Sequence, residues 1–286
     1  MAGVAMIAVA ARDIFDSLFH PEGRATLGRL VSRWVWLAMR RLAPRRSHTL
    51  SLAGPLGLIA VIATWALLLI LGWALVFLPQ LDGFRIEGDA RGGGLVDALN
   101  VSLVSLTTLG FGDAVPEAAW LRIVTPLEAL LGFGLLSASV SWLLLIHPVL
   151  ARRRSLAYEV NLLHREEAES GVALVDLAPD AAERVYADLT SRLIAVERDL
   201  VSFPITYYFF ESDPRFSLPA AAAYLVELAE RGTQATAPAP VRLRARVLQE
   251  ALEDLAATTS MGFHRTPGDS AAELLHGYAR DHLRAG

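Results

Sequence analysis

Thr107-Thr108-Leu109-Gly110-Phe111-Gly112-Asp113 is the stretch of this chain that decides its fold. It lies in a short loop between two strongly apolar segments. Glycine adopts left-handed backbone dihedrals at no steric cost, so a Gly-x-Gly run lets successive carbonyl groups turn to one side. Rings of such carbonyls replace the hydration shell of a cation in an ion-selective pore. The run therefore predicts a cation-binding loop held between two membrane helices.

The same run resembles the signature of the potassium-channel superfamily, Thr-Val-Gly-Tyr-Gly-Asp, with Leu in place of Val and Phe in place of Tyr. The resemblance covers residues 50–150 and indicates a bacterial potassium channel with two transmembrane helices and one pore loop. It implies a selectivity filter, closed by Asp113 and preceded by Thr107, whose backbone holds dehydrated K⁺ ions at Thr108, Leu109, Gly110, Phe111 and Gly112. No cofactor other than the permeant K⁺ is implied.

Composition also favours a membrane protein. The 286 residues are 53% hydrophobic, and the mean hydropathy is +0.40. This is more apolar than an average soluble domain. The chain has no cysteine, which excludes disulfides and thiol catalysis, and all 26 basic residues are Arg, as in proteins from GC-rich bacterial genomes.

Two segments are long and apolar enough to cross a bilayer, for which about 20 residues suffice. No charged residue occurs from Ser47 to Leu81, and we expect the first span at about 54–79. The second span is expected at about 120–150, with Trp120 and Trp142 as interface anchors. The alternative is two buried helices of a soluble protein, which rarely run this far without a charge.

Arginines predict the orientation of the spans. They cluster before the first span and after the second, whereas the segment between carries few; the flanking residues are Arg40, Arg41, Arg45, Arg46, Arg152, Arg153 and Arg154, against Arg85, Arg91 and Arg122 between them. The positive-inside rule then places both termini in the cytoplasm and the loop outside. The chain is predicted to be a multi-pass protein of the inner (plasma) membrane.

Residues 1–50 are expected to form a cytoplasmic arm. The apolar run from Gly3 to Ala11 ends at Arg12, too early for a span, and the role of residues 1–20 stays open. From Arg24 to Leu42 the pattern is that of a basic amphipathic helix, with one apolar stripe at Leu27, Leu30, Val31, Trp34, Leu37 and Ala38. Such a helix lies along a membrane surface, or it packs on the protein's own cytoplasmic domain.

A pore helix is predicted over residues 95–107, with Asp97 favourably placed at the positive end of the helix dipole. Asn100 and Val101 stand where many potassium channels carry aromatic residues that brace the filter and bond the closing acid. The resemblance therefore implies a weaker support around this filter. The acids Asp97, Asp113 and Glu117, repeated in each subunit, are expected to concentrate cations at the mouth.

Three features of the second span are candidates for support and gating. Glu128 is predicted to lie behind the pore helix and to hydrogen-bond Asn100 or Ser102, because an acid inside a span needs a polar partner. Gly132, with Gly134 beside it, lies where the resembled channels have a gating hinge; close packing of helices is the alternative. A hydrophobic constriction is expected at Leu136, Val140 and Leu144.

Residues 151–286 are predicted to form a mostly helical cytoplasmic domain, with helices at 152–169, 180–202, 217–231, 240–258 and 270–284. We expect Asp180 to cap the second of these helices, with Glu183 completing a capping box, and residues 172–177 to form a short strand. The aromatic cluster at residues 203–210 is expected in the core or at a subunit interface. The domain is either a gating module or a passive platform for tetramerisation.

No enzyme, metal or nucleic-acid signature is legible there. The histidines, which include His164, His264, His276 and His282, lack metal-ligand spacing and are expected at the surface, and the acidic domain argues against nucleic acid. No cytoplasmic ligand or protein partner can be named.

The predicted fold class is an all-α membrane protein: two transmembrane helices, a re-entrant pore helix with its filter, and a helical cytoplasmic domain. One loop cannot enclose a fourfold pore, so we expect a homotetrameric potassium channel in a lipid bilayer. The alternatives are a weakly selective monovalent-cation channel, or a non-conducting membrane sensor or scaffold that retains a channel-like pore.

Overall fold

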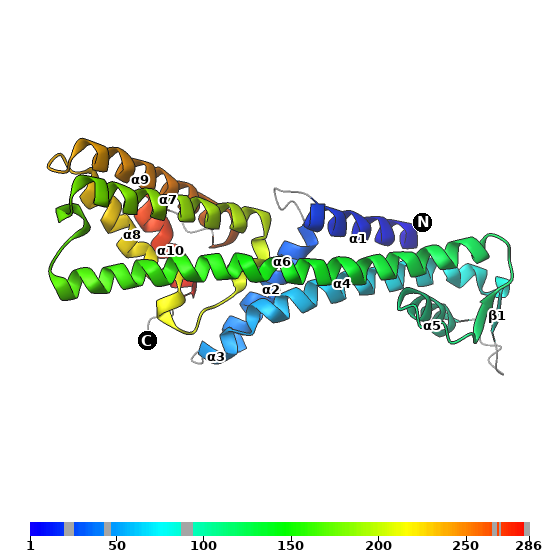
Figure 1. Cartoon of the computed structure of the whole chain (residues 1–286). Helices are drawn as coiled ribbons and strands as arrows, with labels where there is room; N and C mark the ends of the chain where they lie inside the picture. Colours follow the sequence, from blue (N-terminus) through cyan, green and yellow to red (C-terminus); the bar gives the residue numbers. More distant parts are fainter. Residues whose placement is uncertain (20–25, 43–46, 87–93, 265–267, 269, 283–286) are drawn as a thin grey trace. The chain divides into compact units, whose positions relative to one another are not determined.

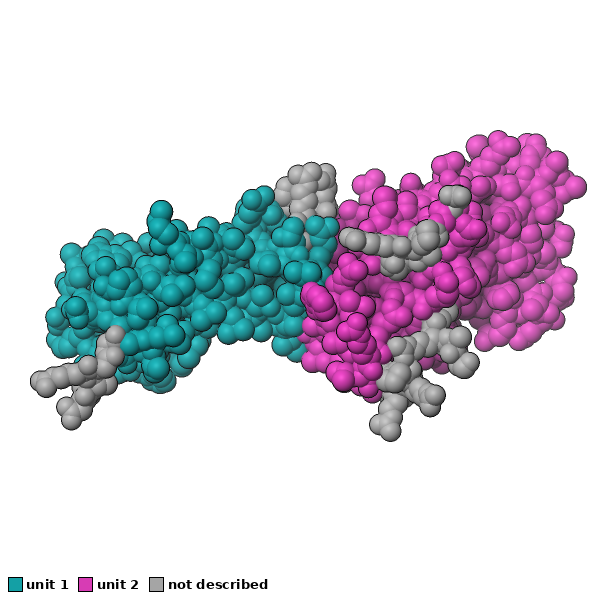
Figure 2. All heavy atoms as spheres, turned by 180° about the vertical axis from the view of Figure 1, so that it is seen from behind, with its two compact units in different colours: residues 1–32, 57–145 teal, residues 33–56, 146–286 magenta. Residues whose placement is uncertain are grey.

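A computed structural model describes residues 1–19, 26–42, 47–86, 94–264, 268 and 270–282 of the chain. Arg24, Arg45, Arg46, Arg91 and residues 283–284 of the last predicted helix lie outside these ranges. The chain divides into two compact units, residues 1–32 with 57–145 and residues 33–56 with 146–286, which Figure 2 colours separately. Each unit is described by itself.

Two apolar helices pass through the first unit. Helix α4 covers Ala53–Phe77 and helix α6 covers Leu121–Ser170, and among the described residues these two are long and apolar enough to cross a membrane. The prediction of two apolar helices of membrane-spanning length is confirmed. The first ends two residues earlier than predicted, because a 3₁₀ turn over Leu78–Gly83 (η1) follows Phe77 with Pro79 near its start.

Helix α6 is a single helix of 50 residues rather than two. The sequence analysis separated a span ending at 150 from a helix beginning at 152. No break occurs there, because residues 149–156 contain no Gly or Pro. Pro148 lies inside the helix, where it removes one backbone hydrogen bond.

Between α4 and α6 the chain forms the pore loop, which we define as residues 78–120. Helix α5 covers Leu95–Leu106, with Thr107 as its C-cap, close to the predicted 95–107. A ribbon of two short antiparallel strands, Phe84–Ile86 (β1) and Ala114–Pro116 (β2), ties the two ends of the loop together, with Arg85 opposite Val115. The sequence analysis did not predict this ribbon.

The amino-terminal part of the chain is helical. Helix α1 covers Ala2–Phe19, and helix α2 covers Thr26–Leu42. Both oxygens of the buried Asp13 carboxylate accept hydrogen bonds from the first backbone N–H groups of α2, at Thr26, Leu27 and Gly28, over 2.9–3.1 Å. Asp13 thus supplies from α1 the N-terminal cap that α2 requires.

The second unit is built around one core. Its helices are the part of α6 from residue 146, α7 (Pro179–Ser202), α8 (Leu218–Thr233), α9 (Ala239–Thr259) and α10 (Ala271–His282). Their buried side chains form a single hydrophobic cluster that also includes Trp36 of α2. We call α7–α10, with residues 146–170 of α6, the C-terminal bundle. Its helices agree with the predicted ones to within about two residues at each described end.

Two local predictions in the bundle are wrong. Residues 172–177 form no strand; Leu174–Asp176 make a 3₁₀ turn (η2) closed by hydrogen bonds between near neighbours. Asp180 is not a helix cap, because α7 begins one residue earlier with Pro179 in its first position, and Ala178 is the capping residue. Proline suits that position since its missing N–H would have no helical partner.

The aromatic cluster at 203–210 belongs to the core, one of the two places predicted for it. Tyr207 and Tyr208 lie in a buried 3₁₀ turn over Pro204–Tyr208 (η3). The Tyr207 ring stacks on Phe263 at 4.1 Å, and its hydroxyl donates to Asp281 Oδ2 over 2.7 Å. Two further short turns complete the unit, Pro214–Phe216 (η4) and a π-helical turn over Ser260–His264 (η5); a four-residue helix, α3, covers Ser47–Leu50.

Candidate functional site

The predicted filter has an alternating backbone. Thr108, Gly110 and Gly112 have φ values of 58°, 59° and 84°, whereas Leu109 and Phe111 between them have no positive φ. Alternation of left-handed and ordinary dihedrals turns successive backbone groups to one side of the chain, as ion-binding backbone sites require. The glycines adopt this conformation freely. Thr108 is the only non-glycine residue among the described ones with positive φ, which the sequence analysis missed.

The filter side chains find no packing within their own chain. Leu109 is 61% exposed and Phe111 is 70% exposed. We expected these side chains to pack behind the filter, but the described residues of the same chain leave both of them exposed. Large exposed apolar side chains that lie together mark an interaction surface.

Asn100 supports the acid that closes the filter. Its Nδ2 donates to Asp113 Oδ2 over 3.2 Å, which joins the pore helix α5 to the residue after Gly112. The sequence analysis expected weaker support around the filter, because aromatic residues of other channels are absent at Asn100 and Val101. The Asn100 amide nevertheless donates a hydrogen bond to the acid that follows Gly112.

A buried polar contact joins α4, α5 and α6 behind the pore helix. Glu128 of α6 is fully buried, and its Oε1 lies 2.5 Å from Ser102 Oγ of α5. The same Ser102 hydroxyl lies 3.0 Å from the carbonyl oxygen of Ile70 in α4. The predicted pairing of Glu128 with Ser102 is therefore present, and it connects both spanning helices with the pore helix.

Gly132 provides a second contact one turn along α6. A Cβ built on Gly132 would overlap the carbonyl oxygen of Leu106, whereas a Cβ on Gly134 would meet nothing within 4 Å. Ser102 and Leu106 are one turn apart on α5, as Glu128 and Gly132 are on α6. Gly132 is thus a close-packing glycine, the alternative to the hinge, and Gly134 is the glycine whose surroundings leave room for bending.

The predicted constriction lies on an uncovered face of α6. Leu136, Val140 and Leu144 are spaced by four residues and are 63%, 51% and 66% exposed. Residues four apart lie on one helix face, and no described side chain of the chain covers this one. Two serines nearby, Ser139 and Ser141, donate instead to backbone carbonyls of their own helix.

The acids at the mouth all have partners. Asp97 Oδ2 accepts from the N–H of Gly94 over 3.3 Å at the start of the pore helix, and Thr107 Oγ1 donates to Leu103 O at its end. Glu117 forms an exposed ion pair with Arg85 at 3.4 Å. Exposed pairs of this kind contribute little to stability, but Arg85 offsets part of the negative charge that the acids were expected to supply.

The arginines that follow the second span join α6 to other segments of the C-terminal bundle. Arg152 makes two bonds of 2.7 and 2.8 Å to the carboxylate of Asp199. Arg153 is buried and donates to the carbonyls of Thr206 and Phe209, while Arg154 pairs with Glu211 at 2.7 Å. These contacts hold residues 152–154 of α6 against α7 and against the segment of residues 206–211.

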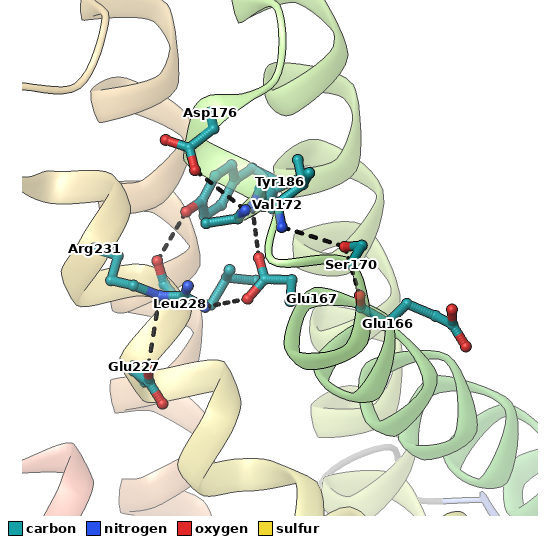
Figure 3. A network of polar contacts seen from close by, with 11 residues as sticks. Glu166, Glu167, Ser170, Val172, Asp176, Tyr186, Glu227, Leu228 and Arg231 are labelled. Carbon is teal, nitrogen blue, oxygen red and sulfur yellow. Dashed lines mark hydrogen bonds and ion pairs between the residues drawn. The ribbon is translucent and has the colours of Figure 1, made fainter.

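The far end of α6 is held by the network drawn in Figure 3. Glu167 Oε1 accepts from the N–H of Leu174 over 2.5 Å, and its Oε2 pairs with Arg231 of α8 at 2.8 Å. Burial raises the pKa of Glu167, but the bonds from Leu174 and Arg231 outweigh it, so that pKa lies below its ordinary value of 4.5. Tyr186 donates to Leu228 O, and burial raises its pKa to about 12.

No metal site occurs among the described residues, where no three His, Asp or Glu side chains come together to hold an ion. The expectation of surface histidines fails for His282, which is buried against Tyr207 and Trp36. His164 stacks on Tyr224 at 4.4 Å. The side chain of His264 lies outside the described residues.

The comparisons with known proteins agree with this geometry. Residues 63–144 match the family model described as an ion channel. A membrane protein of Bacillus subtilis (strain 168), the uncharacterised YdjJ, is 24% identical over 235 residues, which cover 79% of this chain and 67% of YdjJ. No solved structure matches the chain.

The family match covers the second half of α4, the whole pore loop and the part of α6 that faces it. Members of such a family are channels rather than enzymes, and they act as oligomers in a lipid bilayer. The chain is thus a mostly helical protein with two helices of membrane-spanning length, and its residues 63–144 are similar to an ion channel family.

Proposed function

We propose that the chain forms a homotetrameric potassium channel, which conducts K⁺ passively through a pore lined by backbone carbonyl oxygens. The observation that carries this proposal is the alternation of positive φ at Thr108, Gly110 and Gly112 in a loop between two spanning helices. Four copies of residues 108–112 around one axis would form stacked rings of carbonyl oxygens, which take the place of the water around a dehydrated K⁺ ion.

The tetramer is supported by the surfaces that one chain leaves uncovered. The single loop cannot close a pore alone, and cyclic symmetry is the usual way in which identical subunits close a ring. Leu109 and Phe111 in the loop and Leu136, Val140 and Leu144 on α6 are exposed in one chain. In the tetramer the three α6 residues would line the pore axis as a hydrophobic constriction, the proposed gate.

Selectivity for K⁺ over Na⁺ depends on a filter that keeps its shape. The Asn100–Asp113 bond and the Ser102–Glu128 contact brace the filter from two sides. These contacts favour a selective channel over the weakly selective alternative, although Phe111 has no hydroxyl with which to join the bracing.

The distribution of arginines supports a cytoplasmic location for the C-terminal bundle in the inner (plasma) membrane, with the pore loop on the opposite side. The bundle would then act on the gate, because Arg152, Arg153 and Arg154 bind it directly to α6. The permeant ion is the only cofactor in this proposal.

Ion flux into liposomes tests the function. Purified protein is reconstituted, and uptake of K⁺ and of Na⁺ is followed under the same gradient, with the Gly110→Ala variant as the control for the filter. Uptake of K⁺ well above that of Na⁺, lost in the variant, supports the proposal. Equal uptake of both ions supports the weakly selective alternative, and no uptake from open-gate variants such as Leu136→Ser supports the sensor or scaffold.

A further inference from the structure

Helix α1 has an unusual surface for a helix outside the membrane. Residues 2–11 carry no polar or charged side chain on any face. Val4 and Val9 are 59% and 51% exposed, while Gly3 and Ala10 are buried. A helix that is apolar all round belongs in a protein core or in a bilayer, and no described residue of the chain covers the exposed side of α1.

The buried side of α1 packs on α4. A Cβ on Gly3 would overlap the carbonyl oxygen of Gly72, and one on Gly72 would come 2.8 Å from Ile7 Cγ1. Ten residues farther along α1, Asp13 Oδ2 accepts from Trp65 Nε1 over 2.9 Å. The two helices are therefore antiparallel and in close contact at small residues, the mode of packing common between membrane helices (Figure 1).

These contacts fix the depth of α1 along a membrane span. Gly72 lies near the end of α4 that leads into the pore loop, and Gly3 is therefore beside that end. Asp13 meets α4 at Trp65, which is the middle residue of that helix. The uncharged residues 2–11 thus lie beside the half of α4 that leads into the pore loop, and the charged residues of α1 begin beside the middle of α4.

We propose that α1 is a third helix of the membrane region, packed on α4 of its own chain, with its exposed side against lipid chains. Its apolar residues 2–11 have a length of about 15 Å at 1.5 Å per residue, about half the thickness of a hydrocarbon core of about 30 Å, so α1 is embedded beside α4 without crossing the membrane. The buried Asp13 is tolerated because three backbone N–H groups and the Trp65 indole donate to it.

Lipid is the occupant that the surface favours. The exposed side of residues 2–11 offers aliphatic groups alone, with no polar rim of the kind that surrounds a protein interface. It is also continuous with the exposed face of α4, since the Cβ position of Gly3 lies 3.0 Å from Leu75 Cβ and Leu75 is itself 40% exposed. This replaces the expectation that all of residues 1–50 form a cytoplasmic arm.

Substitution at Gly3 tests the packing, because a side chain there has no room. A Cβ on Gly3 would overlap the carbonyl oxygen of Gly72, whereas Ala5 is an exposed position of the same helix. We expect Gly3→Leu to lower the thermal unfolding temperature of the membrane-reconstituted protein and Ala5→Leu to leave it unchanged. Equal unfolding temperatures of the two variants contradict the packing of α1 on α4.

Spin labels test the exposure to lipid without perturbing the contact. Single variants Val4→Cys and Val9→Cys are labelled with a nitroxide, together with Ala235→Cys in an exposed turn of the bundle as the aqueous control. Labels at residues 4 and 9 should collide more often with dissolved oxygen than with a water-soluble nickel complex. The label at residue 235 should collide more often with the nickel complex. An aqueous pattern at residues 4 and 9 overturns the proposal. Neither experiment requires ion conduction, so its outcome is independent of the channel function.

Discussion

Gly132 of α6 lies directly against the carbonyl oxygen of Leu106, the last residue of the pore helix. One turn away, Glu128 meets Ser102. The pore helix thus contacts α6 at two residues one turn apart, Ser102 and Leu106. The predicted filter begins two residues after Leu106. These contacts place the end of the pore helix that leads into the filter directly against α6.

Replacing Gly132 with Ala is expected to disturb the filter, because the added methyl group displaces the last turn of α5. Overpacking of this kind costs about 1–3 kcal/mol. The K⁺/Na⁺ uptake ratio of reconstituted protein should fall, and the tetramer should dissociate at lower temperature. Gly134→Ala is the matched control, since its methyl group meets no described atom. Equal effects of the two substitutions would favour the hinge interpretation of Gly132.

Glu128→Ala should weaken the contact between the three helices behind the filter. The cavity and the lost hydrogen bond together cost about 2–5 kcal/mol. Thermal unfolding should occur at lower temperature, and K⁺ current should decline faster during sustained opening. Glu128→Gln keeps the volume and a hydrogen bond to Ser102, so it should retain most of the wild-type behaviour. If K⁺ currents in Glu128→Ala are unchanged, Glu128 does not support the filter.

Asn100→Ala should lower selectivity by releasing Asp113. A hydrogen bond to a charged group contributes about 1.5–3 kcal/mol to stability, so its loss should loosen the loop at Asp113, and the K⁺/Na⁺ permeability ratio is expected to fall. The control is Asn161→Ala. It also removes a hydrogen-bonding amide, but that amide donates to Ala157 O in the bundle, far from the filter residues in sequence. A permeability ratio that stays at the wild-type value would show that Asp113 needs no bracing from α5.

The bundle should lose stability in acid through Glu167. Because its pKa is lowered in the folded protein, Glu167 stabilises the fold above its unfolded pKa, and this contribution disappears as pH falls through the folded value. Thermal unfolding of the full chain, followed from neutral pH to about pH 3, should therefore be less pH-dependent in Glu167→Gln. Glu169→Gln, which alters an exposed pair with Arg165, is the control. Parallel pH profiles of wild type and Glu167→Gln would contradict the assignment.

Much of the fold could be read from the sequence because its signals are local. The uncharged runs around Trp65 and Trp142 predicted both spans, and the glycines at 110 and 112 predicted the filter. Likewise, the breaks at Pro179 and around Gly232 predicted the helices of the bundle to within about two residues. These features depend on polarity and backbone preference over a few neighbouring residues.

What the sequence could not provide depends on contacts between distant segments. Three such contacts form only in the folded chain: the hydrogen bond from Asn100 to Asp113, the close contact of Leu106 with Gly132, and the cap that Asp13 provides for α2. The depth of α1 beside Gly72 is of the same kind. The positive φ of Thr108 was missed because threonine rarely adopts it, and only the loop around it imposes that conformation.

The most direct test of the central claim is the reversal potential of the purified protein in a planar bilayer, with K⁺ on one side and Na⁺ on the other. The account predicts a reversal close to the K⁺ equilibrium potential, because rings of backbone carbonyls at residues 108–112 would hold K⁺ and reject the smaller, more strongly hydrated ion. A reversal near zero would contradict it and would show that the braced loop does not select between the two ions.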